Sequence, residues 1–381
     1  MKKLLPYILI LCLLFPLIPR AGATSLEVAG KSAVLMDAAT GTVLYEKNAH
    51  EPLAPASVTK VMTMLLIMEA IDSGKIRWED TVTASETAAA KGGSQIYLKV
   101  GETMSVSDMV KSIAVSSAND CACAMAEHLS GSEAAFVEAM NQRAKELGMN
   151  DTNFVNCTGL DDGPDAQNHK TSAYDIALMS RELLTKHPDI KKYTTIWMDT
   201  VRNGAFGLSN TNKLVRFYPG ATGLKTGFTS TAGYCLSATA EREGMELIAV
   251  VMGAESSNVR NTACKQLLDY GFANYALVSP MPEEEPTVEV KLGTAAQVRL
   301  VPGEAPQLLI DKGIKNSITS EITLSESVSA PVAPGQQLGT LTVRAGEQIL
   351  AKIPLVAETE VPRLSWGQLF RLVMKDIAMG G

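Results

Sequence analysis

Three short strings supply side chains that could perform nucleophilic chemistry. In chain order they are Ser57-Val58-Thr59-Lys60, Ser117-Ala118-Asn119 and Lys225-Thr226-Gly227. A serine hydroxyl is a weak nucleophile until a nearby base removes its proton. A lysine three residues later on a helix returns to the same face. The first string therefore predicts Ser57 as a nucleophile and Lys60 as its general base. The alternative, an N-cap serine with a surface lysine, is disfavoured by the ordered occurrence of all three strings.

The second string supplies a hydroxyl and an amide. We expect Ser117 to relay a proton to or from Lys60. We expect Asn119 to hydrogen-bond a substrate amide, because its side chain both donates and accepts. The alternative is that Asn119 or Asp120 only caps the helix that follows.

The third string supplies positive charge and space. Positive charge on Lys225 would lower the pKa of a neighbouring lysine base, and the Thr226 hydroxyl suits a substrate carboxylate. Gly227 has no side chain, so we expect it to leave room for the substrate to approach the backbone. An oxyanion hole needs two donors aimed at the developing charge. We expect the backbone N–H groups of Ser57 and Phe228 to supply them.

Hydrophobic and capping patterns predict the helices around the first two strings. Residues 61–70 form a Met- and Leu-rich run typical of a buried helix, with the nucleophile at its start, where the helix dipole favours negative charge. Ser105-Val106-Ser107-Asp108 resembles a capping box that opens a helix over residues 109–115. A further helix is expected over residues 121–129. The second string then lies on the loop between two helices.

Strand patterns surround the third string and also occur near the start of the chain. Residues 33–36 and 43–45 flank a turn and predict a hairpin. Residues 233–240 and 247–252 predict two further strands joined by a turn. The third string precedes this meander, so we expect it to lie on a strand that lines the site.

The first 23 residues have the pattern of a secretory signal. Two lysines precede a nearly continuous apolar run, and Ala21-Gly22-Ala23 has the small-x-small form of a cleavage site. Cleavage after Ala23 places the mature protein outside the cytoplasm. It leaves 31 basic against 41 acidic residues, a net charge of −10. This balance argues against a nucleic-acid partner.

Five cysteines follow the predicted cleavage site, and an odd number cannot all pair within one chain. The chain has no C-x-x-C string and few histidines, so a structural zinc site is not expected. We interpret the cysteines as small buried apolar residues.

Composition divides the rest of the chain into three parts. A catalytic domain is expected over residues 24–278, and a linker rich in proline and glutamate over residues 279–286. Short alternating runs separated by turn residues then predict a small β-sandwich over residues 287–361. Residues 362–381 form the last part.

The last part has one apolar helix face. Its large apolar residues follow helical spacing: Trp366, Leu369, Phe370, Val373 and Ile377. Such a stripe with basic flanks predicts an amphipathic helix lying in a membrane interface. The alternative is a helix that docks on the β domain.

Together the three strings and four longer segments resemble the serine-type D-alanyl-D-alanine carboxypeptidases, which are low-molecular-mass penicillin-binding proteins. The resemblance extends over about residues 26 to 278. The additional matching segments are residues 93–98, 119–122, 153–160 and 169–175.

This resemblance implies a penicillin-binding or β-lactamase-like α/β (α+β) domain with a central antiparallel sheet packed against helices. It implies removal of the terminal D-Ala from the pentapeptide stem of peptidoglycan, which regulates cell-wall cross-linking, through an acyl-enzyme on Ser57. It also implies acylation by β-lactams, no metal or organic cofactor, and attachment to the outer face of the cytoplasmic membrane. The roles already given to the three strings agree with it. Arg260 weakly matches a position that helps to bind the substrate carboxylate; its alternative is a surface arginine at a helix start.

Three other functions stay open on the sequence. A class A β-lactamase needs a glutamate after the second string for deacylation, and no glutamate occurs from Leu147 to Ser180. A transpeptidase would use the same acyl-enzyme. A non-catalytic peptidoglycan-binding scaffold is disfavoured because the Ser–Lys pair is intact.

Overall fold

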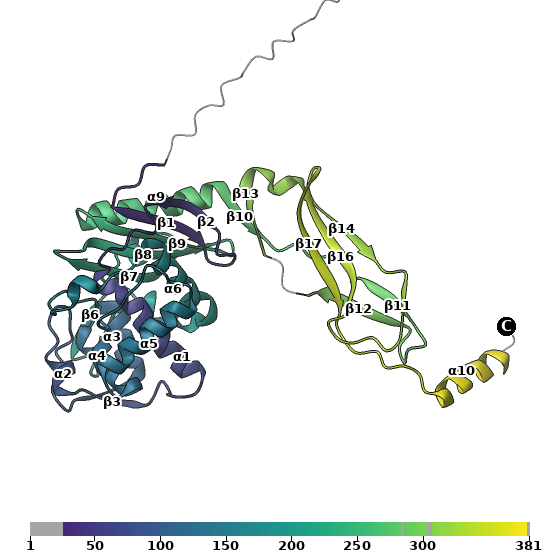
Figure 1. Ribbon diagram of the computed structural model, residues 1–381, viewed down its shortest axis with the longest axis horizontal. Coiled ribbons are helices and arrows are strands. Elements are labelled where there is room, and N and C mark those ends of the chain that lie inside the picture. The colour runs from purple at the N-terminus through teal and green to yellow at the C-terminus, as the bar shows by residue number, and fades with distance from the viewer. Residues whose placement is uncertain (1–25, 283–284, 304–306, 379–381) are drawn as a thin grey trace, which may run out of the picture.

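The computed structural model describes residues 26–282, 285–303 and 307–378 of the 381-residue chain. The expected signal peptide, residues 1–23, lies outside the described residues. Figure 1 shows an α/β body, a separate β domain beside it and a helix at the far end of that domain.

A five-stranded antiparallel sheet forms the centre of the α/β body. In spatial order its strands are β2 (Val43–Lys47), β1 (Ser32–Asp37), β9 (Met245–Ala254), β8 (Gly233–Arg242) and β7 (Ala221–Thr229). The inner strands are almost entirely buried because they are runs of small and apolar residues covered on both faces. The predicted hairpin and meander are confirmed. The K-T-G string lies on β7, an edge strand with one side free of other strands.

Helices cover both faces of the sheet (Figure 1). On one face lies α9 (Ser257–Asn274), while α6 (Ala173–Lys186) lies on the other and contacts α1 (Lys60–Asp72). Gly271 lets α9 approach the sheet closely, since a Cβ there would lie 2.4 Å from Leu247 Cδ1. Each face of the sheet therefore has its own apolar core.

The helical layer also contains α3 (Val106–Ser116), α4 (Asn119–Ser130) and α5 (Glu133–Glu146). The predicted N-cap of α3 is confirmed, because the Asp108 N–H donates to Ser105 Oγ at 3.1 Å. The N-cap of α4 is Ala118, which makes no side-chain cap bond. The capping interpretation of Asn119 and Asp120 is therefore wrong: both residues lie inside the first helical turn.

Short elements complete the α/β body. They are η1 (Ala56–Thr59), β3 (Thr81–Thr83), α2 (Glu86–Ala89), β4 (Thr103–Ser105), η2 (Ala166–Asn168), η3 (Pro188–Ile190), α7 (Lys191–Thr194), β5 (Met198–Val201), β6 (Phe206–Ser209) and α8 (Leu214–Phe217). The strands β5 and β6 pair as a hairpin.

The β domain contains one six-stranded sheet. Its strands, in spatial order, are β14 (Ile318–Leu324), β16 (Gln337–Ala345), β17 (Gln348–Ala357), β12 (Gln297–Pro302), β11 (Thr287–Lys291) and β15 (Ser327–Ser329). One core combines buried side chains of β11, β12, β16 and β17, so this continuous sheet curls around it. The sequence predicted a small β-sandwich over residues 287–361, and the strands of this domain form one continuous order in the sheet.

A second sheet joins segments on either side of the expected linker. The strand β10 (Tyr275–Val278) ends the α/β body and pairs with β13 (Leu308–Asp311), which is followed by η4 (Lys312–Ser317). A segment from the C-terminal part of the chain thus extends the first domain. The domain boundaries expected from the sequence, at residues 278 and 287, did not predict that β13 would pair with β10.

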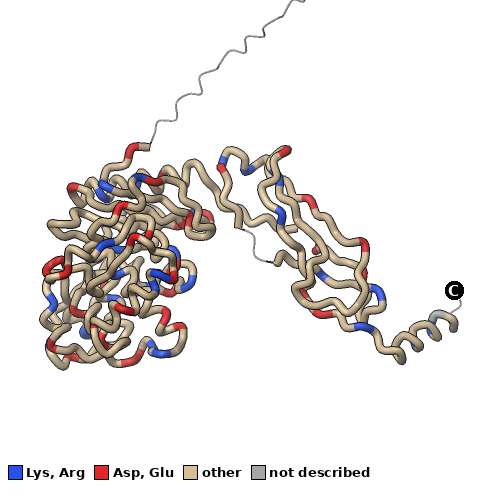
Figure 2. Tube along the Cα trace, viewed as in Figure 1, with Lys and Arg blue, Asp and Glu red and all other residues tan. Residues whose placement is uncertain are grey.

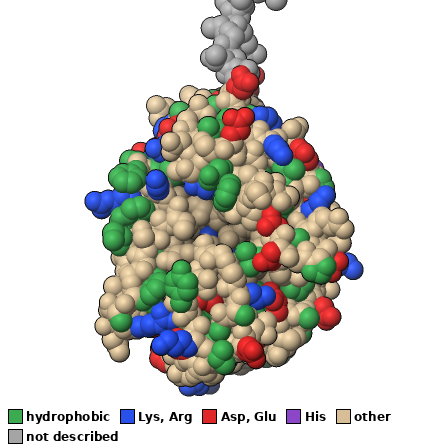
Figure 3. Space-filling view, turned by 90° about the vertical axis from the view of Figure 1, so that its left-hand side faces the viewer, with side chains coloured by type: hydrophobic (Ala, Val, Ile, Leu, Met, Phe, Trp, Pro, Cys, Tyr) green, Lys and Arg blue, Asp and Glu red, His purple; other side chains and the backbone are tan. Residues whose placement is uncertain are grey.

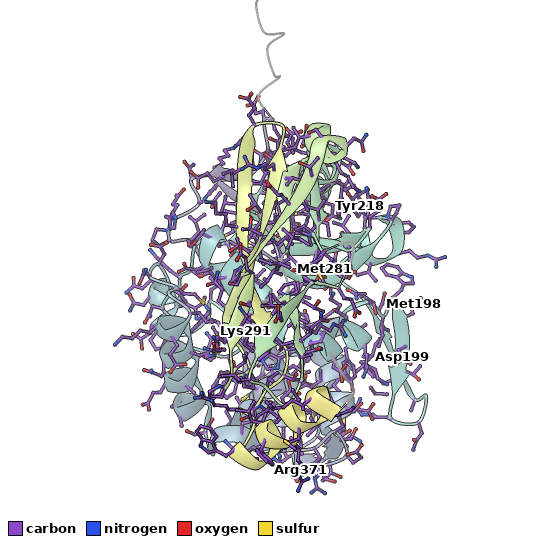
Figure 4. All side chains as sticks on the ribbon, turned by 90° about the vertical axis from the view of Figure 1, so that its right-hand side faces the viewer. Met198, Asp199, Tyr218, Met281, Lys291 and Arg371 are labelled. Atoms are coloured by element: carbon purple, nitrogen blue, oxygen red, sulfur yellow. The ribbon has the colours of Figure 1, made fainter. Side chains whose placement is uncertain are left out.

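The last helix, α10 (Trp366–Ala378), exposes its apolar residues. Trp366 is 88% exposed, Phe370 67% and Ile377 70%. Figure 4, in which Arg371 is labelled, shows α10 outside the body of the β domain. The alternative of docking on that domain is not realised. None of the described helices is both long and apolar enough to cross a membrane.

Charges of both signs are interspersed along the described chain (Figure 2). All five described cysteines are buried and unpaired, which confirms their interpretation as core residues: Cys121, Cys123, Cys157, Cys235 and Cys264.

Candidate active site

The chain places Ser57 in η1, directly before α1. Ala56 adopts a left-handed φ of 48°, an uncommon conformation for a non-glycine residue that marks the turn into the helix. Lys60 Nζ lies 2.9 Å from Ser57 Oγ and 2.8 Å from the carbonyl oxygen of Thr158. The predicted Ser–Lys contact therefore exists, and Thr158 gives the ammonium group a second partner.

Burial controls the charge of both lysines. Lys60 has no exposed surface, and its burial lowers its pKa to about 7, although Cys157 and Asp120 act in the opposite direction. Burial, followed by the charges of Lys60 and Arg260, holds the pKa of Lys225 well below its ordinary value. With a pKa of about 7, neutral Lys60 is available near neutral pH, and the charge of Lys60 in turn disfavours protonation of Lys225.

Ser117 and Asn119 lie between α3 and α4. Ser117 ends α3 with a left-handed φ of 62° and is almost fully buried. The hydrogen bonds of Lys60 go to Ser57 and Thr158, and none among the described residues joins it to Ser117. The proton relay through Ser117 stays a prediction from the sequence.

Asn119 makes defined contacts through both its backbone and its amide. Its N–H donates to Ser94 O and its Nδ2 to Gly92 O, each at 2.7 Å. Its Oδ1 is buried and has no partner among the described residues. A buried acceptor without a partner is costly, and a substrate N–H would satisfy it.

The K-T-G string presents polar groups along the edge strand β7. Lys225 Nζ donates to Thr226 O at 2.9 Å, and the hydroxyls of Thr226 and Thr211 lie 2.6 Å apart. A Cβ on Gly227 would lie 2.7 Å from Pro55 O and 3.1 Å from Ser57 N. The expectation that Gly227 makes room for substrate is therefore wrong, because the backbone before Ser57 fills that space.

This close approach positions the two expected oxyanion donors. The Ser57 N–H lies beside β7, and the Phe228 N–H follows directly after Gly227 on the same strand. The Phe228 side chain is 54% exposed and packs against Tyr234, with the ring centroids 4.3 Å apart and the rings tilted. The absence of a side chain at residue 227 is thus what brings the two strings together.

Arg260 lies in the first turn of α9 and is buried. Its guanidinium carbon lies 5.8 Å from the Tyr234 ring centroid, and its charge depresses the pKa of Lys225. The alternative of a surface arginine is wrong, since the side chain is buried and lies near Tyr234 of β8. Arg260 therefore supplies a buried positive charge close enough to act on Lys225.

Two supporting residues were not assigned a role from the sequence, although both lie within matching segments. His169 Nε2 lies 2.7 Å from Thr59 Oγ1, and burial, with a smaller effect of Lys60, lowers the pKa of His169 to about 4. Gly159 has φ 82°, and a Cβ there would lie 1.8 Å from Ala56 O. Both residues hold the turn that presents the nucleophile, and neither contact could be read from sequence spacing.

Figure 3 shows a hollow in the face of the α/β body that lies away from the β domain, with a basic side chain deep inside it and hydrophobic side chains around it. The described residues contain no cluster of His, Cys, Asp or Glu suited to hold a metal. The site therefore offers a serine nucleophile, a neutral lysine base, two candidate oxyanion donors and positive charge for a carboxylate.

Comparisons with known proteins agree with this arrangement. Residues 20–256 match the D-alanyl-D-alanine carboxypeptidase family, and residues 280–363 match the C-terminal domain of penicillin-binding protein 5. The D-alanyl-D-alanine carboxypeptidase DacF of Bacillus subtilis is 44% identical, over 99% of both chains.

Solved structures show the same likeness. Penicillin-binding protein 5 from Haemophilus influenzae is 31% identical with a TM-score of 0.75, covering 90% of this chain and all of that one. Penicillin-binding protein D2 from Listeria monocytogenes, in its ampicillin-bound form, is 33% identical with a TM-score of 0.59, covering 64% of this chain and 98% of that one. The chain belongs to the D-alanyl-D-alanine carboxypeptidase family, peptidase family S11.

Proposed function

We propose that this D-alanyl-D-alanine carboxypeptidase acts through an acyl-enzyme on Ser57, with Lys60 as general base. The observation that carries the proposal is the 2.9 Å contact between Lys60 Nζ and Ser57 Oγ, made by a fully buried lysine whose pKa is lowered to about 7. A lysine of ordinary pKa would be protonated and unable to accept the serine proton.

The first half-reaction follows from these groups. Neutral Lys60 takes the Ser57 hydroxyl proton as Oγ bonds to the carbonyl carbon of the penultimate D-alanine. The N–H groups of Ser57 and Phe228 stabilise the negative charge on the carbonyl oxygen. The bond to the terminal D-alanine then breaks, and its amine receives a proton from Lys60, directly or through Ser117. Water subsequently hydrolyses the ester, with Lys60 again as base.

Binding groups lie on either side of the nucleophile. The substrate's terminal carboxylate binds beside Lys225, Thr226 and Arg260, because Arg260 is a buried cation and the other two offer hydrogen-bond donors on β7. A carboxylate bound there favours the protonated form of Lys225. Asn119 Oδ1, which is buried without a partner, accepts an N–H from the amino side of the substrate. The substrate therefore extends from the K-T-G strand across the nucleophile to Asn119.

The stem peptide of peptidoglycan is the substrate that fits this reaction, and β-lactams are the covalent inhibitors. The Listeria relative with bound ampicillin supports the second assignment. The exposed apolar face of α10 supports attachment to a membrane surface, and the sequence of residues 1–23 supports export. We infer a peripheral protein on the outer face of the cytoplasmic membrane.

D-alanine release from a soluble pentapeptide tests the proposal. Ser57→Ala should reduce kcat by at least about a thousandfold, as expected when a covalent nucleophile is removed. Ser73→Ala, at the exposed end of α1, is the matched control and should keep full activity. Residual activity of Ser57→Ala above one-tenth of the unmodified rate would refute Ser57 as the nucleophile.

A further inference from the structure

A loop of residues 91–98, here called the cleft loop, is built against the S-x-N string. Ser94 O accepts the Asn119 N–H, and Gly92 O accepts from Asn119 Nδ2, each at 2.7 Å. A Cβ on Gly93 would lie only 2.8 Å from that Nδ2. The cleft loop therefore lies directly beside Asn119, the residue proposed to contact the substrate.

Tyr97 projects from the cleft loop into solvent. Its side chain is 65% exposed, and its backbone has a left-handed φ of 60°, a strained conformation for an aromatic residue. The Asp120 carboxylate accepts the N–H groups on either side, from Ile96 at 3.1 Å and Leu98 at 3.0 Å. The residue after Asn119 thus fixes a strained, outward-facing tyrosine, a combination typical of functional positions.

A second aromatic ring lies beside Tyr97. Phe206, at the start of β6, forms an edge-to-face pair with Tyr97, with ring centroids 6.4 Å apart. The guanidinium carbon of Arg202 lies 5.3 Å from the Phe206 ring centroid. Arg202 donates to Ile96 O at 2.7 Å and is paired with Glu102 at 2.7 Å. These contacts lock the β5–β6 hairpin to the cleft loop and hold the ring pair rigid.

We propose that Tyr97 and Phe206 form a subsite that stacks against a sugar ring of the peptidoglycan substrate. The inference rests on the proposed function and specifies how that site selects its substrate. With the terminal carboxylate at the K-T-G strand and an amide at Asn119, the amino side of the stem passes over the cleft loop. The sugar is attached at that amino end.

The lengths agree with this placement. A stem of five extended residues spans about 17 Å. Tyr97 is three residues after Ser94, hence within about 11 Å of it along the chain, and Ser94 touches Asn119. The sugar end of the stem can therefore reach Tyr97 while the other end occupies the nucleophile.

The chemistry of the surface favours a sugar over a second peptide. A sugar ring presents an apolar C–H face, which suits an exposed aromatic ring, and hydroxyl edges that stay in water. An acidic peptide would need a free cation beside the ring pair, and Arg202, which touches Phe206, is already paired with Glu102.

The test compares two substrates with the same pentapeptide, one free and one carrying the disaccharide. We measure kcat/KM for the full chain and for Tyr97→Ala, Tyr97→Phe and Val100→Ala. Tyr97→Ala and Tyr97→Phe both keep a Cβ, so the strain at residue 97 is unchanged. Val100, 67% exposed and three residues away, is the matched control.

The unmodified protein should cleave the disaccharide substrate about three- to tenfold more efficiently than the free peptide, the range expected for one aromatic stack. Tyr97→Ala should abolish this preference and leave the free peptide unchanged, while Tyr97→Phe and Val100→Ala keep it. An equal loss on both substrates would show that Tyr97 only supports Asn119, and no loss would show that no sugar binds there; either result overturns the subsite. If the unmodified protein cleaved neither substrate, the proposed function would be overturned, and the subsite with it.

Discussion

Replacing Lys60 with methionine should make the protein more stable and inactive. Lys60 is fully buried, and its pKa falls from 10.5 to about 7 on folding. A lysine with a lowered folded-state pKa binds its proton less well when folded, so the folded state loses stability as the pH falls from about 10.5 to 7. A fall of about 3.5 units corresponds to about 5 kcal/mol.

The hydrogen bonds that Lys60→Met loses reduce this gain in stability. Methionine has a similar shape but leaves Ser57 Oγ and Thr158 O without the contacts that Lys60 makes at 2.9 and 2.8 Å. Each unsatisfied group costs about 1–3 kcal/mol, and Ser57 Oγ can be solvated in the cleft. We therefore expect Lys60→Met to stabilise the protein by about 1–3 kcal/mol at pH 7.

Urea unfolding at pH 7, 8.5 and 10 measures the effect. The advantage of Lys60→Met should shrink as the pH rises, since neutral Lys60 carries no burial penalty for charge. Lys91→Met is the matched control: Lys91 is half-buried and pairs with Glu133 at 2.5 Å, so its removal should destabilise the protein. A stability difference between Lys60→Met and the unmodified protein that is constant from pH 7 to 10 would refute the reasoning.

Three further results follow from the structure. Because the pKa of Lys60 is about 7, kcat/KM should fall about tenfold per unit below pH 6, and a pH profile flat down to pH 5 would contradict Lys60 as base. Arg260→Ala should lower kcat/KM about 10- to 150-fold for peptides with a free terminal carboxylate, the cost of one charge-assisted contact; a peptide amidated at that end should show no such loss, and an equal loss on both would remove the assigned role. Deleting residues 362–381 should abolish co-sedimentation with anionic lipid vesicles while D-alanine release from a soluble peptide is unchanged, and undiminished sedimentation would defeat the anchor.

Local patterns were sufficient to predict the elements that carry the site. The three-residue spacing of Ser57 and Lys60 gave their contact, because helical geometry places those positions on one face. Ser105 gave the start of α3, because a cap depends only on residues nearby in the chain. The strand that carries Lys225 followed from the turn and apolar runs after it.

Contacts between distant segments were not predictable in the same way. The role of Gly227 depends on Pro55, 172 residues earlier, whose carbonyl oxygen occupies the space next to it. The burial of Arg260 depends on how α9 packs on the sheet. The sequence of α9 does not separate apolar from polar residues onto opposite faces, so it does not show which face is buried. The pairing of β10 with β13 brings a later segment back to the first domain across the expected linker.

Labelling of the purified mature protein with fluorescent penicillin tests the central claim most directly. The account predicts a label that persists with time on the unmodified protein and is absent from Ser57→Ala, because the drug acylates that hydroxyl. The same label on Ser57→Ala, or no label on either protein, would contradict an acyl-enzyme at Ser57. Rapid loss of label with hydrolysis of the drug would instead indicate a β-lactamase.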